Sequence, residues 1–151
     1  MFPALQVVDE IALTNASPAV TRLLDHKNWE VRGNAAATLG RLQNIDSEAE
    51  SALVRCLKDG QPIVRGNAAS SLCNAKQLDT LAASALIDCL NDTNQAVRLN
   101  SISALARCGA EARRAIPKLR ELANSNGGLD VRNNAKRVLD EIEARTAETA
   151  K

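Results

Sequence analysis

The stretch Val31-Arg32-Gly33-Asn34 returns at a fixed interval along the chain. The copies are Val64-Arg65-Gly66-Asn67, Val97-Arg98-Leu99-Asn100 and Val131-Arg132-Asn133-Asn134, at steps of 33, 33 and 34 residues. A period in this range is typical of stacked supersecondary units, each of which closes its core on its neighbours. The repeat therefore predicts a solenoid.

Apolar and small residues recur in each copy with a helical period. Val31, Ala35 and Leu39 stand four residues apart, and the other copies repeat this stripe. A second apolar segment precedes each copy. Equivalent positions in these segments are 33 residues apart and are occupied by Pro18, Ser51, Ser84 and Pro117. Each unit thus consists of a helix A and a helix B joined by turns rich in Asp, Asn and Gly. We expect an all-α, right-handed α-α superhelix of four two-helix repeats.

The chain reads as a single domain over residues 1–151, with a capping helix at 1–15 and a polar tail at 147–151. The repeats are expected at about 16–44, 45–77, 78–110 and 111–146, with B helices starting near 28, 61, 94 and 128. Pro62 fits a first helical turn. Ser47 and Glu50 have the spacing of a capping box, and Pro117 is expected inside an A helix, which it would bend.

The amino-acid composition argues against several classes of binding partner. The 151 residues carry 19 basic and 18 acidic side chains, one Phe, one Trp and no Tyr. A near-neutral chain has no general attraction for nucleic acid, and a base-stacking surface would need aromatic rings. No apolar run approaches the roughly 20 residues that span a bilayer, and the N-terminus lacks the basic start of a signal peptide. We expect a cytoplasmic protein without a membrane partner.

Nothing in the sequence indicates catalysis, a cofactor or a metal. The four cysteines form no C-x-x-C pair and have no partner histidines, so we interpret them as reduced, structural thiols. The one histidine, His26, lies in a turn without a nucleophile at a recognisable spacing. Gly127-Gly128 is not followed by the Gly-Lys-Ser/Thr of a phosphate loop. We predict a noncatalytic protein.

The two flanks of helix B differ across the repeats. Arg32 lies on one side of the core stripe and Asn34 on the other. On the arginine flank, the positions five and nine residues after the valine are small or apolar in three repeats but are Lys136 and Asp140 in the fourth. Charged residues are needed where stacking stops. We infer that the arginine flank faces the following repeat, the asparagine flank faces the preceding one, and the array ends at the fourth repeat.

The asparagines that recur once per repeat allow two interpretations. An amide both donates and accepts hydrogen bonds, and it is costly to bury unpaired. Each could bond a turn or helix end of a neighbouring repeat and so hold the stack together. Alternatively, the row could receive an extended peptide. The four residues are Asn34, Asn67, Asn100 and Asn134.

The B-helix face opposite the core is the candidate binding surface, because B helices usually line the concave side of a solenoid. Its small residues leave room for a partner, and its arginines favour acidic groups. Trp29 is either a lid on the end of the core or an interface anchor. We expect an unidentified protein or peptide to contact Asn34, Arg41, Asn67, Asn74, Asn100, Arg107, Asn134 and Arg137.

The Asp at the A–B turn followed by Val-Arg at the start of helix B resembles the HEAT repeat family, particularly the short HEAT-like repeats of phycobilin lyases. The resemblance covers about residues 17–145 and implies an α-solenoid, a fold that serves many roles. It also implies a ladder of ion pairs along the stack, with Ser125 replacing the acid in the fourth repeat. The ladder would join Asp25, Asp59 and Asp92 with Arg32, Arg65 and Arg98.

Two alternatives to a scaffold stay open. The resemblance to lyase-type repeats implies an accessory subunit that handles a tetrapyrrole chromophore. The arginines of the B face suggest a binder of the nucleic-acid backbone, acting through Arg41, Arg107 and Arg137.

Overall fold

The computed structural model describes residues 17–42, 45–125 and 128–149. These parts contain helices and turns but no strand. The expected capping helix at 1–15 lies outside them. Residues 17–22 are helical and continue into η1 (Leu23–Asp25). There follow α2 (Trp29–Leu42), α3 (Ser47–Cys56), α4 (Pro62–Leu72), α5 (Thr80–Cys89), α6 (Gln95–Leu105), η2 (Gly109–Ala115), α7 (Ile116–Ala123) and α8 (Leu129–Thr149).

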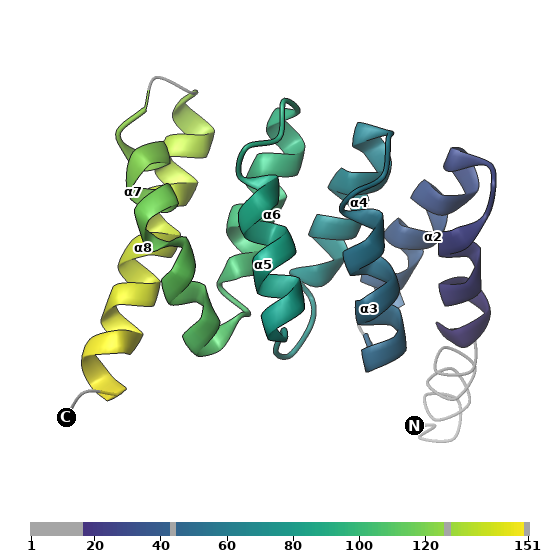
Figure 1. The fold of residues 1–151 in the computed structure, drawn as a ribbon, viewed down its shortest axis with the longest axis horizontal. Helices are drawn as coiled ribbons and strands as arrows, with labels where there is room; N and C mark the ends of the chain where they lie inside the picture. Colours follow the sequence, from purple (N-terminus) through teal and green to yellow (C-terminus); the bar gives the residue numbers. More distant parts are fainter. Residues whose placement is uncertain (1–16, 43–44, 126–127, 150–151) are drawn as a thin grey trace, which may run out of the picture.

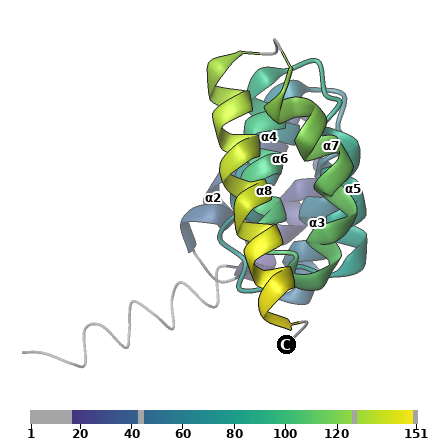
Figure 2. The ribbon, with the colours of Figure 1, turned by 90° about the vertical axis from the view of Figure 1, so that its left-hand side faces the viewer.

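The helices form two parallel layers. The A layer contains α3, α5 and α7, and the B layer contains α2, α4, α6 and α8 (Figures 1 and 2). Consecutive B helices contact one another more extensively than consecutive A helices do, so the B layer lies on the inner side of the stack. This arrangement confirms the α-solenoid predicted from the repeat. No helix in the described ranges is both long enough and apolar enough to cross a membrane.

The core is a continuous stripe of small aliphatic side chains. Val64, Val97 and Val131 are completely buried, whereas Val31, in the first repeat, is half-buried. Ala36 and Ala69 are also fully buried on the flank that meets the following repeat. Alanines let neighbouring helices approach closely, which explains how a chain with two aromatic residues fills its core.

Helix starts follow local capping rules, with one correction. Pro62 opens α4 as expected, since its missing N–H is not needed in the first turn. The capping box predicted at Ser47 and Glu50 is wrong. Asp46 caps α3, and its carboxylate accepts from Ala49 N at 2.8 Å. Glu50 instead accepts a hydrogen bond from the backbone N–H of Asp79, which lies in the following repeat, at 3.0 Å.

Pro117 does not stand in the middle of one continuous A helix, as we had expected. Pro117 stands in the first turn of α7, and the 3₁₀ helix η2 comes directly before it. A proline in the first turn of a helix loses no intrahelical hydrogen bond. The fourth A segment is therefore divided between two helices.

Candidate partner-binding face

The ladder of ion pairs joins successive repeats. Arg32 binds the Asp59 carboxylate through Nε at 2.6 Å and Nη2 at 3.0 Å. Arg65 binds Asp92 in the same way, at 2.6 and 2.9 Å. Each arginine thus reaches the aspartate of the following repeat, 27 residues on, which confirms the orientation inferred for the arginine flank.

These hydrogen bonds lower the pKa values of the two aspartates. The hydrogen bond from Arg65 is the main cause that lowers the pKa of Asp92, and Arg32 does the same to Asp59. The two aspartate side chains are each 8% exposed. The ladder is incomplete at its ends, because Asp25 pairs with Arg55 at 2.9 Å and Arg98 meets no carboxylate in the described residues.

The asparagines bond the preceding repeat. Asn67 Nδ2 donates to the Gly33 carbonyl at 2.9 Å, and Asn100 Nδ2 donates to the Gly66 carbonyl at 2.9 Å. Asn134 Nδ2 donates to the backbone of Leu99 at 3.1 Å and also to a serine hydroxyl. The acceptors are carbonyls within the neighbouring B helix, and not at a turn or helix end as we had expected. Asn34 is exposed.

A second row of hydrogen bonds satisfies backbone carbonyls at the C-terminal ends of the B helices. Asn74 Nδ2 donates to Gly40 O at 2.9 Å, and Arg107 Nε donates to Cys73 O at 3.0 Å. The last carbonyls of a helix have no intrahelical donor and need such partners. The guanidinium of Arg145 does the same for Ala106 O. Two predicted site residues, Asn74 and Arg107, therefore also hold the stack together.

The arginines of the B face do not form one patch. Arg41 is exposed and donates to Thr38 Oγ1 at 3.0 Å. Arg137 donates to Asn134 Oδ1 at 2.9 Å and lies 3.6 Å from Glu141. Arg41 lies near the end of α2 and Arg107 lies in the turn after α6, and α4 stands between these two helices (Figure 1). A partner that meets both arginines must therefore span three repeats.

A recess of about 320 Å³ opens between the first turns of α2 and α4. Trp29 and Ile63 line it and are 41% and 52% exposed. Asn34 and Asn67 supply polar edges, and Gly33 adds no side chain. Trp29 is therefore only partly covered by the stack. The sequence analysis did not predict Ile63 as part of this surface. The one indication in the sequence is that Ile63 is a large apolar residue outside the core stripe of its helix.

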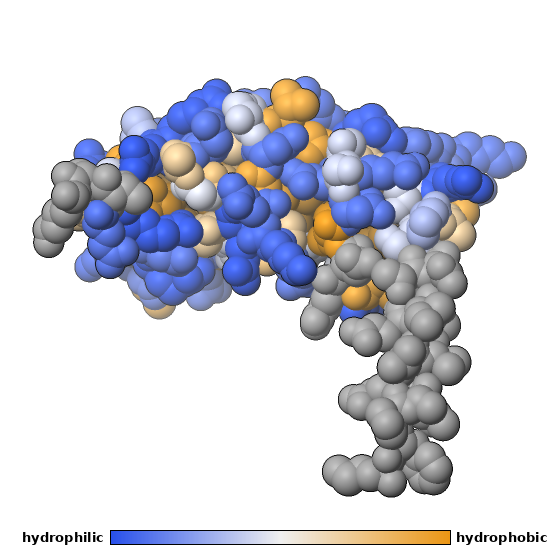
Figure 3. Space-filling view, turned by 90° about the horizontal axis from the view of Figure 1, so that it is seen from below, coloured by the Kyte–Doolittle hydropathy of each residue, from blue (hydrophilic) through white to orange (hydrophobic). Residues whose placement is uncertain are grey.

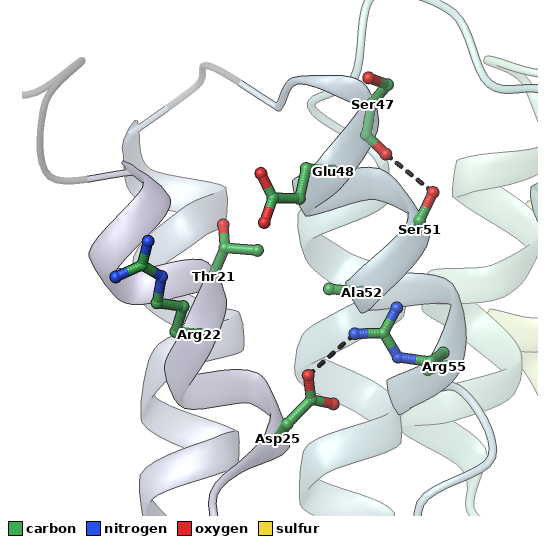
Figure 4. A pocket seen from close by; sticks show the side chains of 8 residues that line it. All are labelled: Thr21, Arg22, Asp25, Ser47, Glu48, Ser51, Ala52 and Arg55. Atoms are coloured by element: carbon green, nitrogen blue, oxygen red, sulfur yellow. Dashed lines mark hydrogen bonds and ion pairs between the residues drawn. The ribbon is translucent and has the colours of Figure 1, made fainter.

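A second recess, of about 450 Å³, lies between residues 17–25 and α3, on the A side (Figure 4). Polar side chains dominate it, and the Arg55–Asp25 ion pair crosses it. Seen from below, the surface is largely hydrophilic with scattered apolar residues (Figure 3). The recess at Trp29 differs from its surroundings in having two large apolar side chains.

The four thiols are held in their protonated form. Burial raises the pKa of the Cys56, Cys73 and Cys89 thiols to about 11 and that of Cys108 to about 12. A thiol is reactive only as the thiolate. His26 Nδ1 accepts from Asn28 N at 3.1 Å, as in a local turn. In the described ranges, no three His, Cys, Asp or Glu side chains are placed to hold a metal.

Paired A and B layers joined by side-chain ladders define an α-helical repeat protein. The family profile of HEAT repeats matches residues 4–73 and 51–140. The chain therefore belongs to the HEAT repeat family. No curated protein shows a significant sequence match.

Solved structures support the same fold. The complex of CpcE and CpcF of phycocyanin lyase from Nostoc sp. PCC7120 is similar with a TM-score of 0.75 and 25% identity, over 91% of this chain and 56% of that chain. Computationally designed armadillo repeat proteins for modular peptide recognition give 0.69 and 27%, over 83% and 63%. A designed armadillo repeat protein in complex with peptide (KR)4 gives 0.70 and 24%, over 83% and 63%. The chain thus spans about 56–63% of these structures' lengths.

Proposed function

We propose that this protein is a noncatalytic scaffold whose B-helix face binds an extended segment of a protein partner. The observation that carries the proposal is the recess between α2 and α4, where Trp29 and Ile63 stay half exposed. Half-exposed tryptophan beside a concavity is typical of interface anchors. The similarity to designed proteins for modular peptide recognition, at 27% identity, supports a peptide-like partner.

The distances along helix B suggest what such a segment contains. Trp29 and Arg41 lie 12 residues apart on α2, which corresponds to about 18 Å along the helix axis. An extended chain covers that distance in about five or six residues. We therefore expect a large apolar side chain in the recess and an acidic side chain about six residues away, near Arg41.

The asparagine row contributes acceptors to this surface in the proposed complex. Nδ2 of Asn67 and Asn100 is occupied by the preceding helix. Their Oδ1 atoms accept no hydrogen bond from the described residues and can accept one from a peptide N–H. Stacking and peptide binding are then compatible roles of one amide.

A selection from a randomised peptide library on the purified protein tests the proposal. Selected peptides should bind the Trp29→Ala/Ile63→Ala double variant at least tenfold more weakly, with unchanged helix content by circular dichroism. Leu81→Ala is the matched control, since Leu81 lies on α5 of the A layer and is 72% exposed. Equal affinity for the double variant and the wild type would place binding elsewhere.

The acidic contact has its own test. Arg41→Glu is preferable to a change at Arg107, because Arg107 also bonds the Cys73 carbonyl. Binding of acidic peptides should weaken in Arg41→Glu and remain unchanged in Lys58→Glu, an exposed cation at the α3–α4 turn. A similar loss in both variants would indicate a general charge effect only.

A second candidate function is the handling of a linear tetrapyrrole by an accessory subunit. The specific observation is the similarity to the complex of CpcE and CpcF of phycocyanin lyase, at a TM-score of 0.75. Mixing the protein with a linear tetrapyrrole and recording the visible spectrum tests it. A shifted absorbance that Trp29→Ala removes would favour this candidate, and an unchanged spectrum would eliminate it.

A further inference from the structure

Three arginines of the B helices are held in the same way at their own turns. Arg65 Nη1 donates to the Asp59 carbonyl at 2.8 Å. Arg98 Nη1 donates to the Asp92 carbonyl at 2.7 Å and to the next carbonyl at 3.1 Å. Arg32 Nη1 likewise bonds two turn carbonyls. The anchor at Nη1 fixes the plane of each guanidinium before any partner arrives.

The opposite edge of the guanidinium distinguishes Arg98 from the other two. In Arg32 and Arg65, Nε and Nη2 hold both oxygens of an aspartate 27 residues further on. The residue 27 positions after Arg98 is Ser125, whose hydroxyl donates to the Leu122 carbonyl. Within residues 17–42, 45–125 and 128–149, no Asp or Glu lies within ion-pair distance of Arg98.

Neighbouring acids cannot fill the fork. Asp92 lies six residues before Arg98, but both of its carboxylate oxygens are engaged by Arg65. Asp92 Oδ1 also accepts from Asn94 N at 2.8 Å. Among residues 17–42, 45–125 and 128–149, the Nε and Nη2 donors of the half-buried Arg98 thus meet no acceptor.

We propose that the Nε/Nη2 edge of Arg98, between the third and fourth repeats, is a carboxylate-binding site. Parallel donors match both oxygens of a carboxylate. The same fork already holds a carboxylate in two earlier repeats, so the geometry is established within this chain. Because the guanidinium is fixed in advance, binding costs little side-chain entropy. The ligand is a carboxylate of a partner, either an Asp or Glu side chain or a chain end.

The site is independent of the recess at Trp29. Arg98 lies in the first turn of α6, and its Nη1 atom is bonded to the turn that precedes this helix. The recess lies between α2 and α4. Loss of one site therefore leaves the other to be measured separately.

The test is NMR of the arginine side chains with acetate as the probe. The Nε–Hε signal of Arg98 should shift saturably with sodium acetate and not with sodium chloride at equal ionic strength. The Arg65 signal should stay in place, since Asp92 already occupies its fork. Arg41, which is exposed and donates to the Thr38 hydroxyl, controls for weak surface binding. An Arg98 response no larger than that of Arg41 would overturn the proposal.

Ser125→Asp supplies the missing carboxylate from within the chain. We expect the Arg98 signal to move toward that of Arg65 and to stop responding to acetate, and the thermal midpoint to rise. Ser125→Asn, which has the same shape without the charge, should respond to acetate as the wild type does. If Ser125→Asp responds to acetate as strongly as Ser125→Asn, the fork is not the site and the proposal fails.

Two short peptides then separate the two sources of carboxylate. One has an internal Glu and an amidated C-terminus, and the other has a free C-terminal carboxylate and no acidic side chain. The peptide that shifts the Arg98 Nε–Hε signal at the lower concentration identifies the source of the carboxylate. If neither exceeds a neutral, amidated peptide, a partner carboxylate is ruled out.

Discussion

Gly40→Ala should destabilise the protein although alanine favours helix. A Cβ atom at Gly40 would lie 2.5 Å from the Ser71 hydroxyl oxygen and 3.1 Å from the Ser71 Cα atom. The second contact is with backbone, so a rotamer change cannot relieve it. Gly33 is the matched control in the same helix, since its Cβ would meet side-chain atoms at 3.7 and 3.8 Å, which is ordinary van der Waals contact.

The magnitude follows from opposing effects. Alanine gains about 1 kcal/mol of helix propensity over glycine. Overpacking costs typically 1–3 kcal/mol. Separating α2 from α4 also strains the bonds from Ser71 Oγ to the Ala36 carbonyl at 2.6 Å and from Asn74 to the Gly40 carbonyl at 2.9 Å. Each contributes about 1 kcal/mol. We expect Gly40→Ala to lower the free energy of unfolding by about 2 kcal/mol, and Gly33→Ala to leave it unchanged or raise it by up to about 1 kcal/mol.

Urea denaturation followed by circular dichroism measures both variants. For a chain of this size, a loss of about 2 kcal/mol corresponds to a thermal midpoint lower by about 4–8 °C. A Gly40→Ala variant as stable as the wild type would refute the reasoning, because the two helices would then not be in contact at Gly40. Equal destabilisation by Gly33→Ala would also refute it, since the effect would not depend on the local distance.

Three further predictions concern charge, capping and thiols. The folded-state pKa of Asp92 is lowered, mainly by its hydrogen bond from Arg65, so its stabilising contribution is complete above about pH 4 and is lost as the pH falls through the lowered value. Asp92→Asn should cost about 1–3 kcal/mol at pH 7 and should flatten the decline of the urea midpoint toward pH 3. Asp46→Ala should cost about 1 kcal/mol through loss of the α3 cap, and Ser47→Ala should cost less in the same melt. In the folded protein, pKa values near 11 leave roughly a hundredfold less thiolate than the ordinary 9.0 would, so iodoacetamide should label the thiols slowly at pH 8 and rapidly in urea. Rapid labelling of Cys56, Cys89 and Cys108 in the folded protein would contradict their burial.

The sequence alone was sufficient for the architecture. The 33-residue period and the four-residue apolar spacing are local properties, and they predicted helices, their order and their stacking. Sequence comparison between repeats also predicted which flank of helix B faces which neighbour. The bond from Arg65 to Asp92 on one side and the bond from Asn67 to Gly33 on the other confirm it.

The details of the candidate site required the fold. The stacking bonds of Asn74 and Arg107, and the recess that unites Trp29 with Ile63, join residues 34 positions apart. The helical period sets the angle of a side chain around its own helix. It does not set how far one helix is shifted along the next, and that shift depends on close contacts such as the one between Gly40 and Ser71. Which donors meet which carbonyls, and where a recess opens, follow from that shift.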